Sequence, residues 1–257
     1  GSFIEHLGRA VYEGIYQEGS ALSDEQASEK IPWILSKSFR YRSSVTRAET
    51  LSPVFTGKTS VGPKDKRPAK PDLAWGVIET NEFGLNEFAD WSKKAGSDIM
   101  MAVNLGTRGP EDAKNVLEYC NFKGGTYYSD LRKSHGYKDP HNIKLWCLGN
   151  EMDGPWQIGS WDKDPRGYGV LANETSKVMK WIDPTIETAV CASSAIFMDH
   201  YPEWEETVLE QCYDSVDYLS MHHYHSAPPG DIKALLGGSL YYEEFIDTEA
   251  ALCDVIA

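Results

Sequence analysis

The sequence lacks several features that define common classes of protein. Its apolar runs, such as Ile99 to Val103, are far shorter than the roughly 20 residues that cross a bilayer, and no apolar signal core opens the chain. Positive charge is also scarce, because 25 Lys and Arg residues face 39 Asp and Glu residues and leave a net charge of −14. Phosphate backbones and anionic membranes would be repelled. We therefore expect a soluble protein that binds neither nucleic acid nor membrane.

Paired cysteine motifs are absent as well. The five cysteines are widely spaced, odd in number and never arranged as C-x-x-C, which argues against a disulfide framework and against a zinc site. A reducing compartment fits this usage best, and we expect a cytoplasmic protein. The five are Cys120, Cys147, Cys191, Cys212 and Cys253.

A glycine-rich phosphate loop is missing too. There is no G-x-G-x-x-G, and although Gly57-Lys58-Thr59 imitates the end of a phosphate loop, the glycine required five residues earlier is Ser52. This argues against a doubly wound nucleotide-binding fold, and we expect no cofactor.

What the chain does contain is ordinary globular composition with many aromatic residues. It has 257 residues, 41% hydrophobic and 25% charged, which suits one large domain or two small ones. Trp, Tyr and Phe make up 12% of the chain. Such rings suit sugar-binding clefts, but alone they favour an ordinary core.

Short apolar runs alternate with helix-like stretches from Asp98 onward. Such alternation predicts a parallel sheet, either doubly wound or closed into a barrel. The expected strands are Ile99 to Val103, Ile143 to Leu148, Ile186 to Cys191 and Val216 to Met221, and the expected helices are Pro110 to Cys120, Tyr168 to Ile182, Trp204 to Cys212 and Leu240 to Ile256.

Polar residues follow each expected strand. In a (β/α) barrel this rim carries the chemistry, so the pattern favours a barrel and makes these residues candidates for substrate binding. They are Asn104, Asn150 with Glu151, Ser193 with Ser194, and His222 with Tyr224.

Glu151 is the sharpest catalytic candidate. A glutamate at the end of an apolar strand can be a general acid with a raised pKa, and the amide of Asn150 can hold a sugar hydroxyl beside the bond that breaks. The alternative is that Asn150 and Glu151 only cap the next turn, and the tripeptide Gly149-Asn150-Glu151 taken alone favours this alternative.

Three further residues are weaker candidates. Glu5 also ends a short apolar segment, and alone it fits a surface residue equally well. His222 and Tyr224 point to one face of an extended segment and can orient a substrate or a carboxylate. His223 and His225 beside them raise the alternative of a metal site, but adjacent residues make poor metal ligands and no facing ligand is evident. We expect no metal.

Long strings of this sequence are similar to one known family. Together they resemble the α-L-arabinofuranosidases of glycoside hydrolase family 51 over almost the whole chain except about 27 to 60. The strings are Phe3 to Tyr12, Val61 to Pro68, Asp72 to Trp75, Ile78 to Asn81, Phe83-Gly84, Ala102 to Thr107, Tyr119 to Asn121, Gly149 to Met152 and Gly154 to Gln157.

The resemblance implies a retaining glycosidase on a (β/α)8 barrel followed by a β-sandwich. Glu151 would then be the general acid/base, Asn150 and Glu5 would contact the sugar, and His222 and Tyr224 would be active-site residues after the sixth strand. The expected substrates are glycans of the arabinan or arabinoxylan type that carry terminal α-L-arabinofuranosyl residues, and the complete protein would be a homo-oligomer. A sugar-binding fragment without activity and a barrel glycosidase for another plant glycan remain alternatives.

Two departures from the family pattern are expected to matter. The family's nucleophilic glutamate follows the seventh strand, which would lie beyond Ala257. We therefore expect residues 1–257 to form an incomplete catalytic barrel of about six β/α units, without the nucleophile, strands seven and eight, the sandwich or an initial portion.

The second departure is the segment from about Ala27 to Ser60. Codons permitted for Ser44 to Thr59, read from the third base of the first codon, can encode Arg-Tyr-Pro-Gly-Gly-Asn-Phe, which holds the family's sugar-contacting loop. Our hypothesis is a pair of compensating frame changes near Ala27 and Ser60. Because no apolar run with a period of two remains, we expect residues 28–60 to lack the second barrel strand.

Overall fold

The main sheet is entirely parallel and contains six strands. The structure is a computed structural model, and it describes residues 2–4, 8–25, 28, 45–47 and 60–257. The strands lie in the order β1-β2-β5-β6-β7-β8, while β3 and β4 form a separate antiparallel hairpin. The strands are β1 (Ser2–Ile4), β2 (Val45–Arg47), β3 (Lys70–Asp72), β4 (Val77–Glu79), β5 (Ile99–Val103), β6 (Leu145–Leu148), β7 (Glu187–Cys191) and β8 (Tyr218–Ser220).

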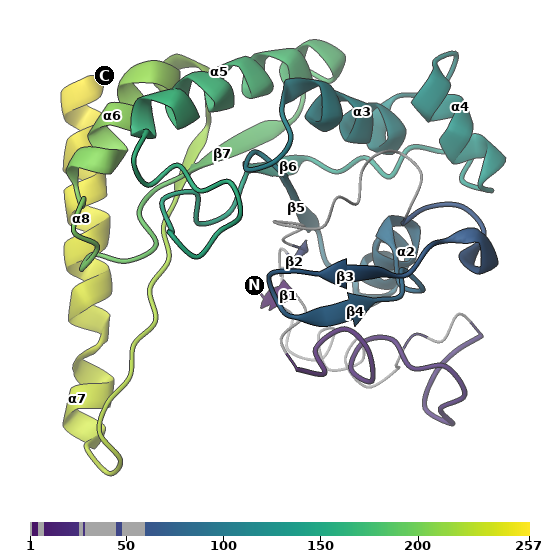
Figure 1. Cartoon of the computed structure of the whole chain (residues 1–257), viewed down its shortest axis with the longest axis horizontal. Coiled ribbons are helices and arrows are strands. Elements are labelled where there is room, and N and C mark those ends of the chain that lie inside the picture. The colour runs from purple at the N-terminus through teal and green to yellow at the C-terminus, as the bar shows by residue number, and fades with distance from the viewer. Residues whose placement is uncertain (1, 5–7, 26–27, 29–44, 48–59) are drawn as a thin grey trace.

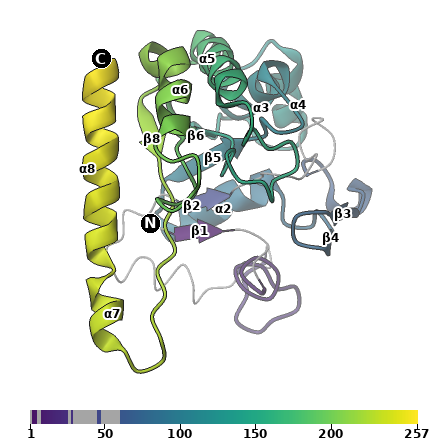
Figure 2. The ribbon, with the colours of Figure 1, turned by 60° about the vertical axis from the view of Figure 1, so that its left-hand side comes forward.

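Helices follow the strands along the chain and cover the sheet. Helix α5 packs against α3 on one side and α6 on the other, so the three form a layer over one face (Figure 1). Helix α8 packs beside α6 (Figure 2). The helices are α2 (Leu85–Ala95), α3 (Pro110–Asn121), α4 (Tyr127–Ser134), α5 (Pro165–Ile182), α6 (Glu203–Cys212), α7 (Ile232–Gly237) and α8 (Ser239–Ile256), with 3-10 turns at Lys64–Lys66 and Tyr213–Ser215.

The four expected β/α units are all present, so this part of the prediction is confirmed. Strand β5 has the expected bounds, and the other expected strands and helices differ from the structure by three residues or fewer at either end. Local chemistry explains the helix starts. Pro110 begins α3, where its missing N–H costs no hydrogen bond, and the Asp164 side chain caps α5 by accepting from the Gly167 N–H at 2.9 Å.

The expectation that residues 28–60 lack the second strand is wrong. Strand β2 lies in this segment and pairs in parallel with both β1 and β5. A three-residue strand paired through its backbone with strands on both edges needs no apolar run. The rest of the proposed frame-shifted segment, apart from Ser28 and Ser60, lies outside the described residues.

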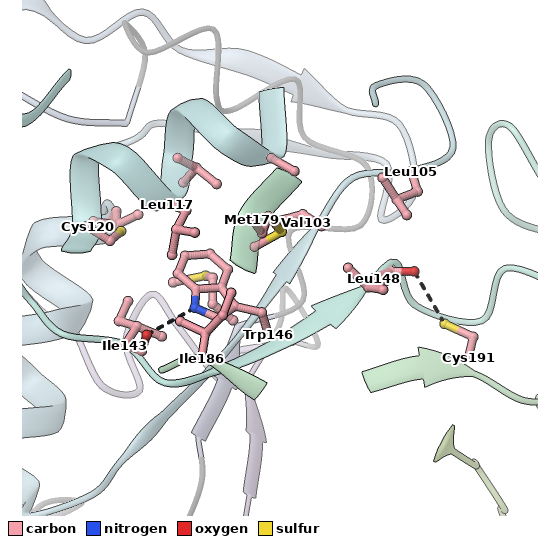
Figure 3. Close-up of a cluster of buried hydrophobic side chains, with 14 of the residues drawn as sticks. Val103, Leu105, Leu117, Cys120, Ile143, Trp146, Leu148, Met179, Ile186 and Cys191 are labelled. Atoms are coloured by element: carbon pink, nitrogen blue, oxygen red, sulfur yellow. Dashed lines mark hydrogen bonds between the residues drawn. The ribbon is translucent and has the colours of Figure 1, made fainter. Parts of the chain in front are cut away.

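The largest core lies between the sheet and its helices. Trp146 of β6 is fully buried there, and its indole N–H donates to the Ile143 carbonyl at 3.0 Å (Figure 3). Alternate residues of the same strands face the other side, where Ala102, Cys147 and Ala189 form a small cluster. The alternation of large and small side chains therefore separates the helix-covered face of the sheet from the opposite face.

In the part of the chain that the structure describes, no helix is long and apolar enough to cross a bilayer. All five cysteines are free, as expected from their spacing.

Candidate active site

Polar residues that follow four neighbouring strands share one edge of the sheet. Asn104 follows β5, Glu151 lies beyond β6, Ser193 beyond β7 and His222 beyond β8. Because these strands are parallel neighbours, their carboxyl ends meet at that edge. The rim expected from the sequence is therefore present, and it brings Glu151 and His222 into contact.

Glu151 is held by side chains at both carboxylate oxygens. Oε1 lies 3.0 Å from His222 Nδ1, and Oε2 accepts a hydrogen bond of 2.8 Å from the indole N–H of Trp156. Gln157 adds a further side-chain hydrogen bond. The side chain of Glu151 retains 16% exposure, so it can still meet a ligand. These contacts favour a site over the alternative in which Glu151 only caps a turn.

The expectation of a raised pKa for Glu151 is wrong for this structure. Burial of the carboxyl acts to raise its pKa, but hydrogen bonds from His222, Trp156 and Gln157, together with the charge of His222, lower the pKa below 4.5 overall. The sequence analysis considered burial at the end of a strand, gave no role to Trp156 or Gln157, and did not include the effect of His222 on this pKa. The carboxylate is therefore ionised at neutral pH in the site as it stands.

The backbone at Glu151 is unusual for a residue with a side chain. Its φ is 48°, and Gly149, two residues earlier, has a φ of 97°. A non-glycine residue in this left-handed region costs roughly 1–3 kcal/mol, and such strain concentrates at functional sites. The turn closes where the Gly154 N–H donates to the Glu151 carbonyl at 2.9 Å.

Tyr168 of α5 ties together the strand ends beneath the site. Its hydroxyl donates to the Leu148 carbonyl at 2.7 Å and accepts from the Cys191 N–H at 2.9 Å. Burial raises the pKa of this hydroxyl well above its ordinary value, so it stays a donor at any working pH. The ends of β6 and β7 are thereby fixed relative to each other.

The other candidate residues differ in how they are placed. Asn104 uses its side-chain oxygen to accept from the backbone N–H groups of Gly106 and Thr107 at 3.0 and 2.9 Å, so it shapes its own loop. Asn150 is half-buried beside Glu151, and Tyr224 is 78% exposed. Glu5 lies outside the described residues. Substrate binding by these four remains a prediction.

The histidines after β8 have separate environments. His222 meets Glu151, whereas His225 bonds through Nε2 to the Ala234 carbonyl at 2.9 Å. The ring of His223 stacks on Tyr241 of α8 with centroids 5.9 Å apart. Within the described ranges, no three His, Cys, Asp or Glu side chains are grouped so that they could hold a metal ion.

Two contacts of Glu151 were missed as functional residues. Trp156 and Gln157 occur in a string that carries the family resemblance, but sequence reasoning gave them no role. The available signal was an aromatic residue five positions after the candidate acid in a loop rich in glycine. Trp156 is 57% exposed and yet donates to Glu151, which a residue serving only the core would not do.

Replacing His222 with Phe is expected to raise the pKa of Glu151. The substitution removes both the hydrogen bond and the positive charge that favour the carboxylate, while burial remains. The pKa can be followed by NMR through the side-chain carboxyl carbon of Glu151 in the 257-residue chain. His135→Phe removes a histidine at the end of α4 and serves as the control. An unchanged Glu151 pKa in His222→Phe would contradict the assigned contact.

Comparison with known families agrees with this geometry. Residues 37–235 match the family model described as the alpha-L-arabinofuranosidase 1 domain, which is more than half of the chain. The chain belongs to this family.

Two kinds of relative extend the likeness over the whole chain. The chain is 50% identical over 256 residues to the intracellular exo-α-(1→5)-L-arabinofuranosidase of Halalkalibacterium halodurans. The matched region is 100% of this chain and 51% of that protein. The structure of AbfB, a family 51 α-L-arabinofuranosidase from Bifidobacterium longum, matches with a TM-score of 0.93 at 36% identity and covers 100% of this chain and 50% of that one.

A second solved structure is similar to this chain over nearly its whole length. An α-L-arabinofuranosidase from Thermotoga maritima, solved as an arabinose complex, matches with a TM-score of 0.90 at 35% identity. The chain spans about half the length of the curated relatives and of the structures it matches. The six-stranded sheet is therefore part of a family 51 (β/α)8 barrel, as the sequence predicted.

Proposed function

We propose that this chain provides the acid/base half of a retaining glycosidase that releases terminal α-L-arabinofuranosyl residues from glycans of the arabinan or arabinoxylan type. The observation that carries the proposal is Glu151, held at the sheet edge by His222 and Trp156 in a chain that belongs to the arabinofuranosidase family. The names of its relatives support the substrate class.

The chemistry follows from two carboxyl groups on opposite sides of the glycosidic bond. Glu151 donates a proton to the leaving oxygen as the bond breaks, and it later takes a proton from the water that releases the sugar. The second carboxylate forms the covalent glycosyl intermediate, and retention requires the two groups to be about 5 Å apart. We expect that nucleophile beyond Ala257, so residues 1–257 would be the incomplete catalytic domain.

The lowered pKa of Glu151 is compatible with this role. A second carboxylate close to Glu151 would disfavour its ionised form by like-charge repulsion and would raise its pKa. Binding of a sugar would act in the same direction by excluding water from a carboxyl that burial already destabilises. In this proposal the resting chain keeps Glu151 ionised, and the complete site protonates it.

The sugar would be bound by Asn104, Asn150, Tyr224 and Glu5. Two carboxyl groups perform this hydrolysis without a cofactor. The relatives named intracellular support a cytoplasmic location. The family resemblance favours a homo-oligomer for the complete protein.

A fusion protein tests the proposal directly. Residues 1–257 would be followed by the carboxyl-terminal half of the Halalkalibacterium halodurans relative, because the chain covers 51% of that protein. A second form would also carry that relative's segment in place of residues 27–60. We expect the second form to release arabinose from 1,5-arabino-oligosaccharides and from arabinoxylan, and not to cleave linear xylan.

The two forms separate the alternatives. Activity in the second form alone would mean that residues 27–60 of this chain prevent hydrolysis, and it would fit the frame-change hypothesis. Cleavage of linear xylan or β-glucan would favour a barrel glycosidase for another glycan. A folded second form that binds arabino-oligosaccharides but hydrolyses none would contradict the proposed acid/base role and favour a sugar-binding fragment.

A further inference from the structure

A fully buried carboxylate lies two residues beyond Glu151. Asp153 has no exposed surface, and its Oδ2 accepts from the Ser194 N–H at 2.9 Å. Its Oδ1 accepts from the Ser194 hydroxyl at 2.5 Å, and His200 Nε2 lies 3.0 Å from Oδ2. A buried carboxylate is tolerated only when its oxygens are bonded in this way. Asp153 therefore links the loop after β6 firmly to the loop after β7.

The turn that carries Glu151 depends on this link. The turn is closed by the hydrogen bond from the Gly154 N–H to the Glu151 carbonyl, and Asp153 is its third residue. On the other side, the Met152 carbonyl accepts from the Trp161 N–H at 2.8 Å. The two residues directly after Glu151 are thus fixed to separate parts of the protein.

The backbone of Glu151 needs such support. Its φ of 48° lies in a region that residues with side chains avoid, and this conformation persists only where neighbouring contacts overdetermine it. Asp153 is two residues from the strained residue, and its two contacts with Ser194 are buried while that with His200 is partly buried. Trp156, by contrast, contacts only the end of the Glu151 side chain. Asp153 is the side chain best placed to hold this backbone.

We propose that Asp153 is a positioning residue that keeps Glu151 in its left-handed conformation and thereby aims its carboxylate at His222 and Trp156. The proposal rests on the proposed function for its catalytic meaning, but the geometry it describes exists without catalysis. Asp153 itself touches no substrate, because it is completely buried.

The indole N–H of Trp156 reports whether Glu151 is in place. In the 257-residue chain, the ¹H–¹⁵N resonance of this group is assigned by its loss in Trp156→Phe. Glu151→Gln sets the position that the resonance takes when the charged acceptor is gone. We expect Asp153→Asn to move the Trp156 resonance by more than half of the shift produced by Glu151→Gln.

Asp217→Asn is the matched control. The Asp217 carboxylate also ties neighbouring strands, since it accepts from the Thr188 N–H at 2.7 Å near the start of β7, and it pairs with Lys180 at 2.7 Å. It acts at the opposite ends of the strands, so its loss should lower the melting temperature without moving the Trp156 resonance. If Asp153→Asn lowers the melting temperature and leaves this resonance at its wild-type position, Asp153 is only structural and the proposal is overturned.

Two further variants keep the test decisive if Asp153→Asn does not fold. Ser194→Ala removes one hydrogen bond and leaves the backbone bond, so a smaller shift in the same direction is expected, and no shift would overturn the proposal. Asp153→Glu keeps the charge and should leave the Trp156 resonance closer to its wild-type position than to its position in Glu151→Gln, and the reverse would overturn the proposal. In the active fusion protein, Asp153→Asn should lower kcat at least tenfold with little change in KM. An inactive fusion protein would count against the proposed function and leave the resonance result unaffected.

Discussion

Glu151→Ala is expected to slow hydrolysis of natural arabino-oligosaccharides by roughly 10² to 10⁴, the usual contribution of positioned proton transfer. The substitution is made in the second form of the fusion protein, in which the relative's segment replaces residues 27–60. A natural leaving group is poor and needs a proton as its bond breaks. An aryl arabinofuranoside with an activated phenol leaves without one, so formation of the glycosyl-enzyme from it should be nearly unaffected. Steady-state and burst kinetics on the two substrates measure the difference.

Glu174→Gln changes an exposed carboxylate on α5 that pairs with Lys177 at the surface, and it should leave both rates unchanged. Equal loss on the natural and the aryl substrate in Glu151→Ala would remove Glu151 from the acid/base role. It would return Glu151 to the capping alternative.

Glu249→Gln is expected to produce the largest change in stability. Glu249 of α8 is 3% exposed and lies against Glu205 of α6, which is fully buried. Burial of the carboxyl, and after it the charge of Glu205, raise the pKa of Glu249 from 4.5 to about 8. At neutral pH the Glu249 carboxyl therefore stays protonated between two helices that pack together.

The sign of the pH dependence follows from the raised pKa. Below pH 4.5 Glu249 is protonated in both the folded and the unfolded chain, so its contribution to the free energy of unfolding is fully present. Between pH 4.5 and about 8 the unfolded chain ionises and the folded chain does not, so this contribution is lost as the pH rises. Glu249→Gln cannot ionise and should match the wild type near pH 4 and exceed it by up to roughly 5 kcal/mol near pH 9.

Urea unfolding of the wild type and the variant across this range measures the difference. Glu243→Gln alters an exposed carboxylate of the same helix and serves as the control, because it should leave the pH dependence of the wild type in place. A free energy difference between Glu249→Gln and the wild type that does not grow with pH would contradict the buried, protonated state of Glu249.

The β/α repeat was predictable because buried strands and amphipathic helices impose periods on the sequence. Strand β5 is a continuous apolar run, and Pro110 together with the regular apolar spacing after it predicts α3. Strand β2 has no such pattern, since its place depends on two neighbouring strands that are distant in sequence. The β3–β4 hairpin was missed for a related reason, because Val77 and Ile78 are exposed and the buried residues of the two strands, Asp72 and Glu79, are charged rather than apolar.

The site was predictable in outline and not in its electrostatics. Glu151 and His222 could be chosen because each follows a strand, and strand ends meet at one edge. The lowered pKa of Glu151 depends first on His222 and then on Trp156 and Gln157, whose side chains fold back from a loop. Asp153 gave no signal either, because a carboxylate in a turn is ordinary in sequence and becomes unusual only when the fold buries it.

The configuration of one product tests the central claim, the acid/base role of Glu151, most directly. Azide added to the Glu151→Ala fusion protein with the aryl substrate should restore turnover, because a small anion attacks the glycosyl-enzyme without general-base help. If Glu151 is the acid/base, the covalent intermediate still forms, and NMR of the product should show arabinofuranosyl azide with the same anomeric configuration as the substrate. Azide of the opposite configuration would mean that Glu151 is the nucleophile, and no azide product would mean that it is neither.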